Sequence, residues 1–116
     1  MIIDDEPAIC EVVARFLGSE YETTCVYSAE AALPMISEKR PNLILCDARM
    51  PRMDGYEFME RVRKDPVGQS IPVIIMTAWG DGTCETRALT LGANGFLPKP
   101  FLASELREFV ASRMPE

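Results

Sequence analysis

Residues 43–55 of the chain read LILCDARMPRMDG, an apolar run that ends at Asp47 and is followed by a turn-rich segment. An apolar run of this kind, bounded by turn residues, predicts a buried β-strand over residues 42–47. In open α/β sheets, ligands bind outside the carboxyl ends of the strands. The sequence therefore predicts that Asp47 lies at the edge of the sheet where a ligand is bound.

Strands and helices are predicted to alternate along the whole chain. Apolar and β-branched runs predict strands over residues 1–4, 21–26, 42–47, 71–76 and 96–97. Apolar residues at helical spacing predict helices from Pro7 to Gly18, from Ser28 onward, from Asp54 to Lys64, over 83–91 and over 102–113. Pro34 falls inside the second helix and is expected to kink or shorten it.

These elements define an α/β fold class. Central strands that are apolar throughout fit a parallel sheet covered on both faces, and right-handed crossovers then give a doubly wound sheet. We expect a (βα)5 arrangement of five parallel strands in the order 2-1-3-4-5, which resembles the flavodoxin-like three-layer sandwich. This order places the first and third strands side by side, so it brings residues 4–5 close to Asp47.

Length and composition indicate a single compact domain over residues 1–116. The formal net charge of −6 argues against nucleic acid as a direct ligand, because phosphate backbones are bound by basic patches. No apolar stretch approaches the roughly 20 residues of a membrane span, and no signal peptide is recognisable. We therefore expect a cytoplasmic protein without a membrane partner.

The cysteine and histidine content narrows the chemistry. Cys10, Cys25, Cys46 and Cys84 lie in apolar patterns without a CxxC pair. This favours small buried side chains in a reducing compartment over a zinc or redox site. The chain has no histidine, so it has no histidine general base, histidine metal ligand or phosphohistidine of its own.

Three carboxylates, those of Asp4, Asp5 and Asp47, are predicted to meet at one edge of the sheet. At a separation of ~5 Å and an effective dielectric constant near 20, each pair of charges repels by roughly 3 kcal/mol. Oxygen ligands of this charge suit a hard divalent cation, above all Mg²⁺. Two alternatives stay open: Asp47 as a cap of the following loop, and Asp5 with Glu6 as the acidic first turn of a helix.

Two further polar residues are predicted at the same edge, Thr77 at the end of the fourth strand and Lys99 after the fifth. Each alone has an ordinary explanation, a turn or helix cap for Thr77 and a solvated surface charge for Lys99. Together with the acids they suit phosphoryl transfer, in which catalysis consists mostly of positioning and charge stabilisation. Asp47 can act as the nucleophile, and because the chain lacks histidine, the donor must be another molecule.

Four segments together resemble the receiver domain of two-component response regulators. They are Asp4-Asp5-Glu6, Asp47 with residues 50–55, Thr77-Ala78 and residues 92–101. The resemblance covers nearly the whole chain. It implies that Asp47 is the phosphoacceptor of a signalling switch rather than part of a turnover enzyme. It also implies that the donor is a sensor histidine kinase or a histidine phosphotransfer protein.

The same resemblance implies a set of metal ligands. Asp5 and Asp47 would bind Mg²⁺, or alternatively Mn²⁺, directly. Asp4 would act through a water molecule, and the backbone carbonyl of Arg49 would complete the set.

The resemblance further implies that Thr77 and Lys99 contact the phosphoryl group, that Lys99-Pro100 is a cis peptide, and that Phe96 is the aromatic residue of the switch. A fixed core position is the alternative for Phe96. The expected output surface consists of the fourth helix, the fifth strand and the fifth helix, which is also the surface expected for a homodimer.

Two other functions compete with this interpretation. A pseudo-receiver would bind proteins without carrying phosphate, and the complete set of acids, Thr77 and Lys99 argues against it. A haloacid-dehalogenase-like phosphatase would need an aspartate two residues after its nucleophile, where this chain has Arg49. In the resembling family, Arg49 and Trp79 would flank the path of the hydrolytic water, so bulky side chains at both positions predict slow dephosphorylation.

Overall fold

The computed structural model describes residues 1–78 and 82–115 of the chain. Strands and helices alternate along these residues, as predicted. The strands are β1 (Ile2–Ile3), β2 (Cys25–Val26), β3 (Ile44–Asp47), β4 (Val73–Thr77) and β5 (Gly95–Pro98). The helices are α1 (Pro7–Leu17), α2 (Ala29–Lys39), α3 (Gly55–Lys64), α4 (Gly82–Thr90) and α5 (Ala103–Arg113), with short 3₁₀ turns at Gly18–Glu20 and Gly68–Ser70.

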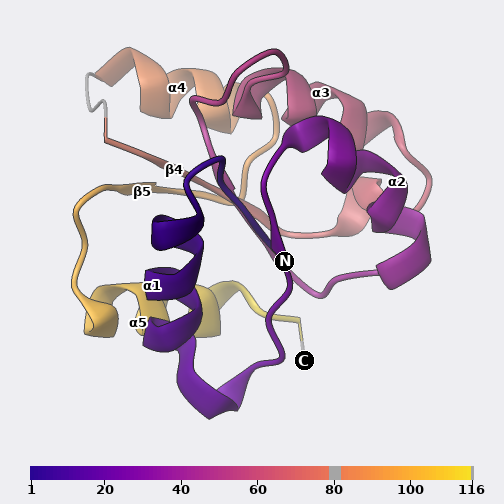
Figure 1. Ribbon diagram of the computed structural model, residues 1–116. Helices are drawn as coiled ribbons and strands as arrows, with labels where there is room; N and C mark the ends of the chain where they lie inside the picture. The colour runs from indigo at the N-terminus through magenta and orange to yellow at the C-terminus, as the bar shows by residue number, and fades with distance from the viewer. Residues whose placement is uncertain (79–81, 116) are drawn as a thin grey trace.

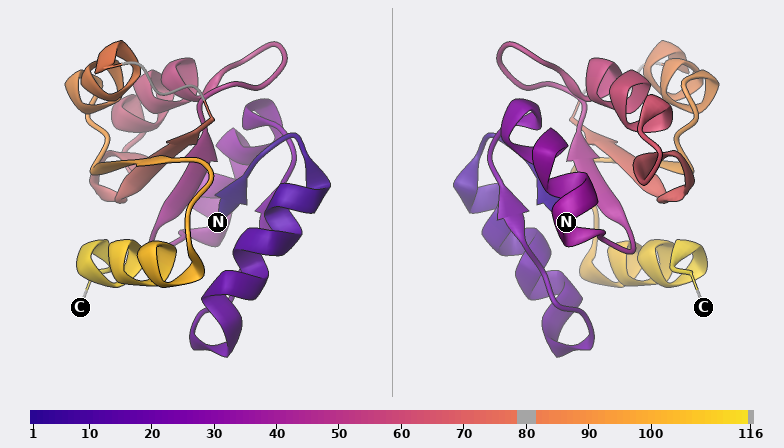
Figure 2. Two further views of the ribbon diagram at one scale, coloured as in Figure 1. Left: turned by 90° about the vertical axis from the view of Figure 1, so that its left-hand side faces the viewer. Right: turned by 90° about the vertical axis from the view of Figure 1, so that its right-hand side faces the viewer.

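The five strands form one parallel sheet in the order β2-β1-β3-β4-β5, which confirms the predicted topology. Helices α2, α3 and α4 cover one face of the sheet and α1 and α5 cover the other, so the molecule has three layers (Figures 1 and 2). Ile3 of β1 lies beside Cys46 of β3. The next residues, Asp4 and Asp47, therefore follow at the same edge of the sheet.

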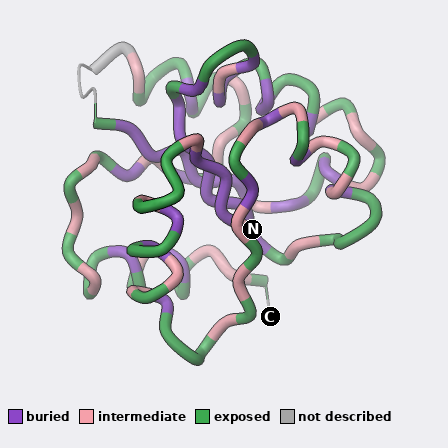
Figure 3. Tube along the Cα trace, in the orientation of Figure 1, coloured by how far each residue is buried: buried purple, intermediate pink, exposed green. Residues whose placement is uncertain are grey.

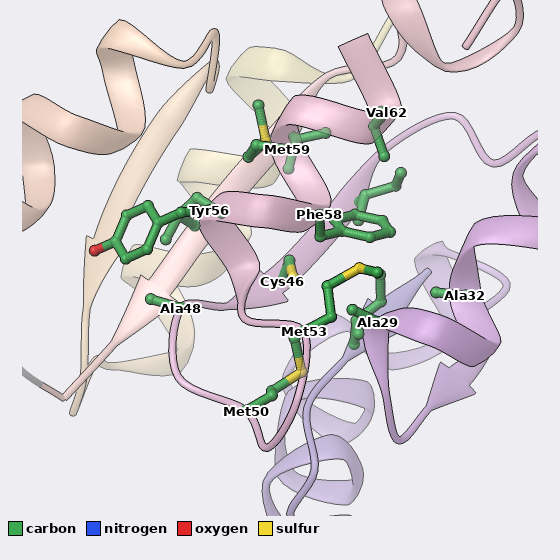
Figure 4. Packing of buried hydrophobic residues seen from close by; sticks show 14 of the residues in the cluster. Ala29, Ala32, Cys46, Ala48, Met50, Met53, Tyr56, Phe58, Met59 and Val62 are labelled. Atoms are coloured by element: carbon green, nitrogen blue, oxygen red, sulfur yellow. The ribbon is translucent and has the colours of Figure 1, made fainter. Parts of the chain in front are cut away.

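Each face of the sheet carries its own apolar layer. Ile44 and Cys46 of β3 belong to the layer under α2, α3 and α4, in which Phe58 is fully buried (Figure 4). Leu45, between them in sequence, belongs to the layer under α1 and α5, together with Leu106. Because both faces are covered, the central strands are apolar throughout. Buried residues are accordingly concentrated in the middle of the trace (Figure 3).

Four strands are shorter than predicted. β1 spans Ile2–Ile3 instead of residues 1–4, and β3 spans Ile44–Asp47 instead of residues 42–47. β2 is confined to Cys25–Val26 instead of residues 21–26. β4 begins at Val73 instead of residue 71. Pro72 has no N–H to donate and contributes only its carbonyl oxygen, which accepts from Ile44 N at 2.9 Å. β5, in contrast, is longer than the predicted 96–97 and extends over Gly95–Pro98.

Pro34 does not end its helix, because α2 runs through it to Lys39. Ala29, Ala32 and Ile36 of α2 are buried against the sheet. Packing of an apolar helix face contributes more to helix stability in proteins than one backbone hydrogen bond. The tertiary contacts of α2 therefore outweigh the bond that the proline removes.

Candidate functional site

Asp4 and Asp47 lie side by side at the carboxyl ends of β1 and β3. The N–H of Asp4 donates to Val26 O of β2 at 3.1 Å. The N–H of Ala48, next to Asp47, donates to Met76 O of β4 at 2.8 Å. The sheet therefore holds the backbone of both acidic residues. Asp4 has no exposed surface and Asp47 has 6%.

Gly55 allows α3 to begin directly against the backbone of Asp47. Its N–H donates to Ala48 O at 2.9 Å. A Cβ atom at this position would collide with the carbonyl oxygen of Asp47 and would lie 2.9 Å from Cα of Ala48. Only glycine fits this close approach of helix and strand without a shift of the backbone.

Lys99 joins the two buried carboxylates. Its Nζ lies 2.8 Å from Oδ2 of Asp4 and 3.2 Å from Oδ1 of Asp47. Its backbone N–H donates to Thr77 O at 2.8 Å, which holds the residue at the end of β4. The side chain is only 14% exposed, so the alternative of a solvated surface charge is wrong. The Lys99–Pro100 peptide bond is cis, as the resemblance implies.

Burial and charge shift the pKa values of this pair. Burial raises the pKa of Asp47 from 3.8 to about 6; the charge of Lys99 opposes the rise, and the charges of Asp4 and Asp5 add to it. Burial lowers the pKa of Lys99, but its hydrogen bond to Asp4 and the charges of Asp47 and Asp4 outweigh this effect and leave the pKa raised. Lys99 therefore stays charged at neutral pH, and one ammonium does not offset all the negative charge of the site.

Asp4, Asp5 and Glu6 form a compact group of possible metal ligands. Each offers one carboxylate oxygen, and these oxygens lie within 4.8 Å of one another. Asp4 is buried, Asp5 half-buried and Glu6 exposed, so the group opens to solvent on one side. A donor set made only of carboxylate oxygens, with excess negative charge, fits a hard cation such as Mg²⁺.

Glu6 was not in the predicted ligand set. The sequence pattern allowed Asp5 and Glu6 to form the acidic first turn of a helix, but α1 begins at Pro7 and its first turn contains no acidic residue. That alternative is wrong. The signal for Glu6 in the sequence was its place in an unbroken acidic triplet after the first strand.

The two predicted switch residues lie on neighbouring strands. Thr77 ends β4 with 1% of its surface exposed and lies beside Pro98 of β5. Phe96 lies beside Ile75, is half-buried, and packs against the apolar layer that includes Ala88 of α4. The side chain of Phe96 is thus partly covered by this apolar layer but is not fully enclosed by it.

The loop after β3 carries two arginines at exposed positions. Arg49, two residues beyond Asp47, is exposed. Trp79, the other residue expected to flank the path of the hydrolytic water, lies outside the described residues. Nε of Arg52 pairs with Oε2 of Glu30 at 3.1 Å and so links the loop to α2. The sequence did not indicate this ion pair, because no local pattern relates the two residues.

The strand order and the acidic edge define a class of protein, the flavodoxin-like α/β sandwich. Its carboxylates lie where the strand order reverses, between β1 and β3. The sequence profile of the response regulator receiver domain matches residues 1–111. The chain belongs to this family of two-component signalling proteins.

Individual relatives agree with this assignment. Response regulator Rre1 of Synechocystis is 33% identical over 112 residues, which are 95% of this chain and 48% of that protein. Response regulator MprA of Mycobacterium avium is 33% identical over 107 residues, which are 91% of this chain and 46% of that protein. The chain thus spans about half the length of the curated relatives that it matches.

Solved structures share the fold. A putative response regulator from Chloroflexus aurantiacus is 35% identical with a TM-score of 0.91, covering 96% of this chain and 92% of that one. The chemotaxis protein CheY4 of Vibrio cholerae is 26% identical with a TM-score of 0.91, covering 97% and 95%. Within the described residues, no helix combines the length and the apolar composition that crossing a membrane requires.

Proposed function

We propose that the chain is a phosphorylation-activated switch of a two-component system and that Asp47 accepts the phosphoryl group. One observation carries the proposal: the ammonium of Lys99 lies within hydrogen-bond distance of two buried carboxylates, those of Asp4 and Asp47. A positive charge held in this way stabilises the negative charge that develops during phosphoryl transfer. In this proposal, residues 1–116 act as one receiver domain.

The phosphoryl donor is a phosphohistidine on a sensor histidine kinase or a histidine phosphotransfer protein, because the chain contains no histidine. A carboxylate oxygen of Asp47 attacks phosphorus, the P–N bond of the donor breaks, and its electron pair returns to the partner's imidazole. The product is an acyl phosphate on Asp47. Since the pKa of Asp47 is about 6, the attacking carboxylate is the main form at neutral pH.

The carboxylates of the site suit Mg²⁺, with Mn²⁺ as an alternative. The residues proposed to hold the ion are Asp4, Asp5, Asp47 and, through its backbone carbonyl, Arg49. When bound, such an ion neutralises carboxylate charge and phosphoryl oxygens. Lys99 stabilises a second phosphoryl oxygen, and the hydroxyl of Thr77 donates to a third.

Thr77 and Phe96 are proposed to carry the change from the site to the surface. Phosphorylation adds about −1.5 to −2 units of charge and three acceptor oxygens. The hydroxyl of Thr77 turns toward these oxygens, and the ring of Phe96 moves into the space that it leaves. The surface formed by α4, β5 and α5 changes as a result and controls an output, and the same surface is proposed for a homodimer. The domain itself does not bind nucleic acid in this proposal.

The test is phosphorylation by acetyl phosphate and Mg²⁺, with the product measured by intact-protein mass spectrometry. We expect the wild-type chain to gain the mass of one phosphoryl group and the Asp47→Asn variant to gain none. Chelation of the metal should abolish the wild-type adduct. A wild-type chain that forms no adduct under these conditions would favour the pseudo-receiver, a protein-binding module that is not phosphorylated.

A further inference from the structure

The side chain of Arg63 joins several segments at the end of the sheet opposite the candidate site. Arg63 lies in the last turn of α3 and is half-buried. Its guanidinium donates to Gly68 O at 3.0 Å, Ile71 O at 2.9 Å, Gly92 O at 3.1 and 2.9 Å, and Asn94 Oδ1 at 2.8 Å. These acceptors lie in three places: the 3₁₀ turn at Gly68–Ser70, the approach to β4, and the α4–β5 connection.

The network satisfies the whole guanidinium group. Five N–H donors are available on an arginine side chain, and Nε, Nη1 and Nη2 use them in five hydrogen bonds. Each of these acceptors is a neutral oxygen. Burial lowers the pKa of Arg63, but a guanidinium group remains charged in proteins. A rigid, planar fork of donors therefore holds the three segments in one geometry.

Asn94 extends the network into the sheet. Its Oδ1 also accepts from Val73 N at 2.9 Å, and its own N–H donates to Val73 O at 2.8 Å. Val73 begins β4 and Asn94 immediately precedes β5. Arg63 thus fixes the starts of the two strands whose other ends lead to Thr77 and Lys99.

The same guanidinium holds the carboxyl end of α4. The N–H of Leu91 donates to Arg87 O at 3.1 Å, and the N–H of Gly92 donates to Leu89 O at 3.0 Å, which closes the helix. Gly92 then turns the chain toward β5 with a φ of 99°. Its carbonyl, which accepts two of the Arg63 bonds, lies in this turn.

We infer that Arg63 is a positioning residue that anchors the carboxyl end of α4 and the start of β5, so that α4 moves from its amino end. The anchor itself does not depend on phosphorylation. Only its consequence for the direction of movement rests on the proposed function. The two parts can therefore be tested separately.

Hydrogen exchange of the unphosphorylated chain, measured by NMR, tests the anchor. In Arg63→Lys, which keeps the charge but loses the fork, amides of residues 91–94 should exchange at least about tenfold faster relative to amides of β3. Arg61→Lys, the same substitution on the exposed side of α3, should leave this ratio unchanged. Equal acceleration of all amides in Arg63→Lys, or no acceleration, would overturn the inference.

Asn94→Asp provides an independent variant that removes no contact. The carboxylate keeps the acceptor for Arg63 and Val73 and adds a charge opposite the guanidinium, so the bond to Arg63 becomes charge-assisted. Exchange of residues 91–94 should slow relative to β3. Unchanged or faster exchange would count against the anchor, including in the case that Arg63→Lys does not fold.

Beryllofluoride with Mg²⁺, a phosphoryl mimic, tests the direction of movement. In the wild-type chain, we expect binding of the mimic to change the amide exchange of residues 84–88 and to have little effect on that of residues 91–94. In Arg63→Lys, the effect should extend to residues 91–94. Equally large changes in both segments of the wild-type chain would refute an anchored end. Failure of the mimic to bind would count against the proposed function. The anchor would then still be tested by the exchange ratios of the unphosphorylated variants.

Discussion

Replacing Asp47 by asparagine is expected to stabilise the metal-free chain at neutral pH. Burial raises the pKa of Asp47 to about 6 in spite of the opposing charge of Lys99. A folded-state pKa above the unfolded value means that ionisation of the group works against folding. Asparagine has nearly the same shape and no charge, so the variant avoids this penalty.

The size of the effect follows from the shift in pKa. A rise from 3.8 to about 6 corresponds to about 3 kcal/mol, at about 1.36 kcal/mol per pKa unit. For a raised pKa, the stabilising contribution of Asp47 is fully present below 3.8 and is lost as the pH rises through about 6. The free energies of unfolding of wild type and Asp47→Asn should therefore be similar near pH 4. At pH 7 and above, the variant should be more stable by up to about 3 kcal/mol.

Urea denaturation in the presence of EDTA, repeated between pH 4 and pH 8, measures this difference. Glu60→Gln removes a carboxylate at an exposed position of α3 and should show no comparable pH dependence. Addition of Mg²⁺ should reduce the difference in the free energy of unfolding between wild type and Asp47→Asn, because an ion that binds the folded wild-type chain stabilises that chain. The reasoning is refuted by an Asp47→Asn variant that is less stable than wild type at pH 7, or by a difference that does not change with pH.

Three further predictions concern the surroundings of Asp47. Gly55→Ala should lower the free energy of unfolding by roughly 1–3 kcal/mol, because its Cβ would collide with the backbone of Asp47. At other helical positions, replacing glycine by alanine stabilises the helix by about 1 kcal/mol. A Gly55→Ala variant that is more stable than wild type in urea denaturation would therefore contradict the predicted collision. Arg49→Ala should shorten the lifetime of phosphorylated Asp47, followed by mass spectrometry over time; an unchanged lifetime would rule out shielding by this side chain. Phe96 should change rotamer when beryllofluoride and Mg²⁺ bind, and crystal structures with the same rotamer in both states would remove it from the switch.

Much of the fold could be predicted from local patterns. The apolar run before Asp47 identified a strand buried on both faces, and alternation with amphipathic helices led to the observed strand order. The boundaries were less accurate, as at β2 and Pro34. The end of a strand depends on which neighbouring backbone groups are available for pairing, and the end of a helix depends on its packing. Neither of these can be seen in a short window of sequence.

The site could be predicted as a set of residues but not as a geometry. Asp4, Asp47 and Lys99 were expected at one edge of the sheet because parallel strands end together. Nothing in the sequence indicated that one ammonium lies 2.8 Å from Asp4 and 3.2 Å from Asp47. In the sequence, Lys99 is 95 positions from Asp4 and 52 positions from Asp47, so these pairs form only when the chain folds.

By itself, the sequence determined the class of the fold, the family resemblance and the acidic edge, because these follow from periodicity and from the order of residues along the chain. The tertiary structure alone decided the burial of Asp4 and Asp47, the raised pKa of Asp47 and the Arg63 network. Burial depends on the helices that cover a strand, and a pKa depends on the charges and the solvent around a group. These surroundings come from residues distant in sequence, so they exist only once the chain is folded.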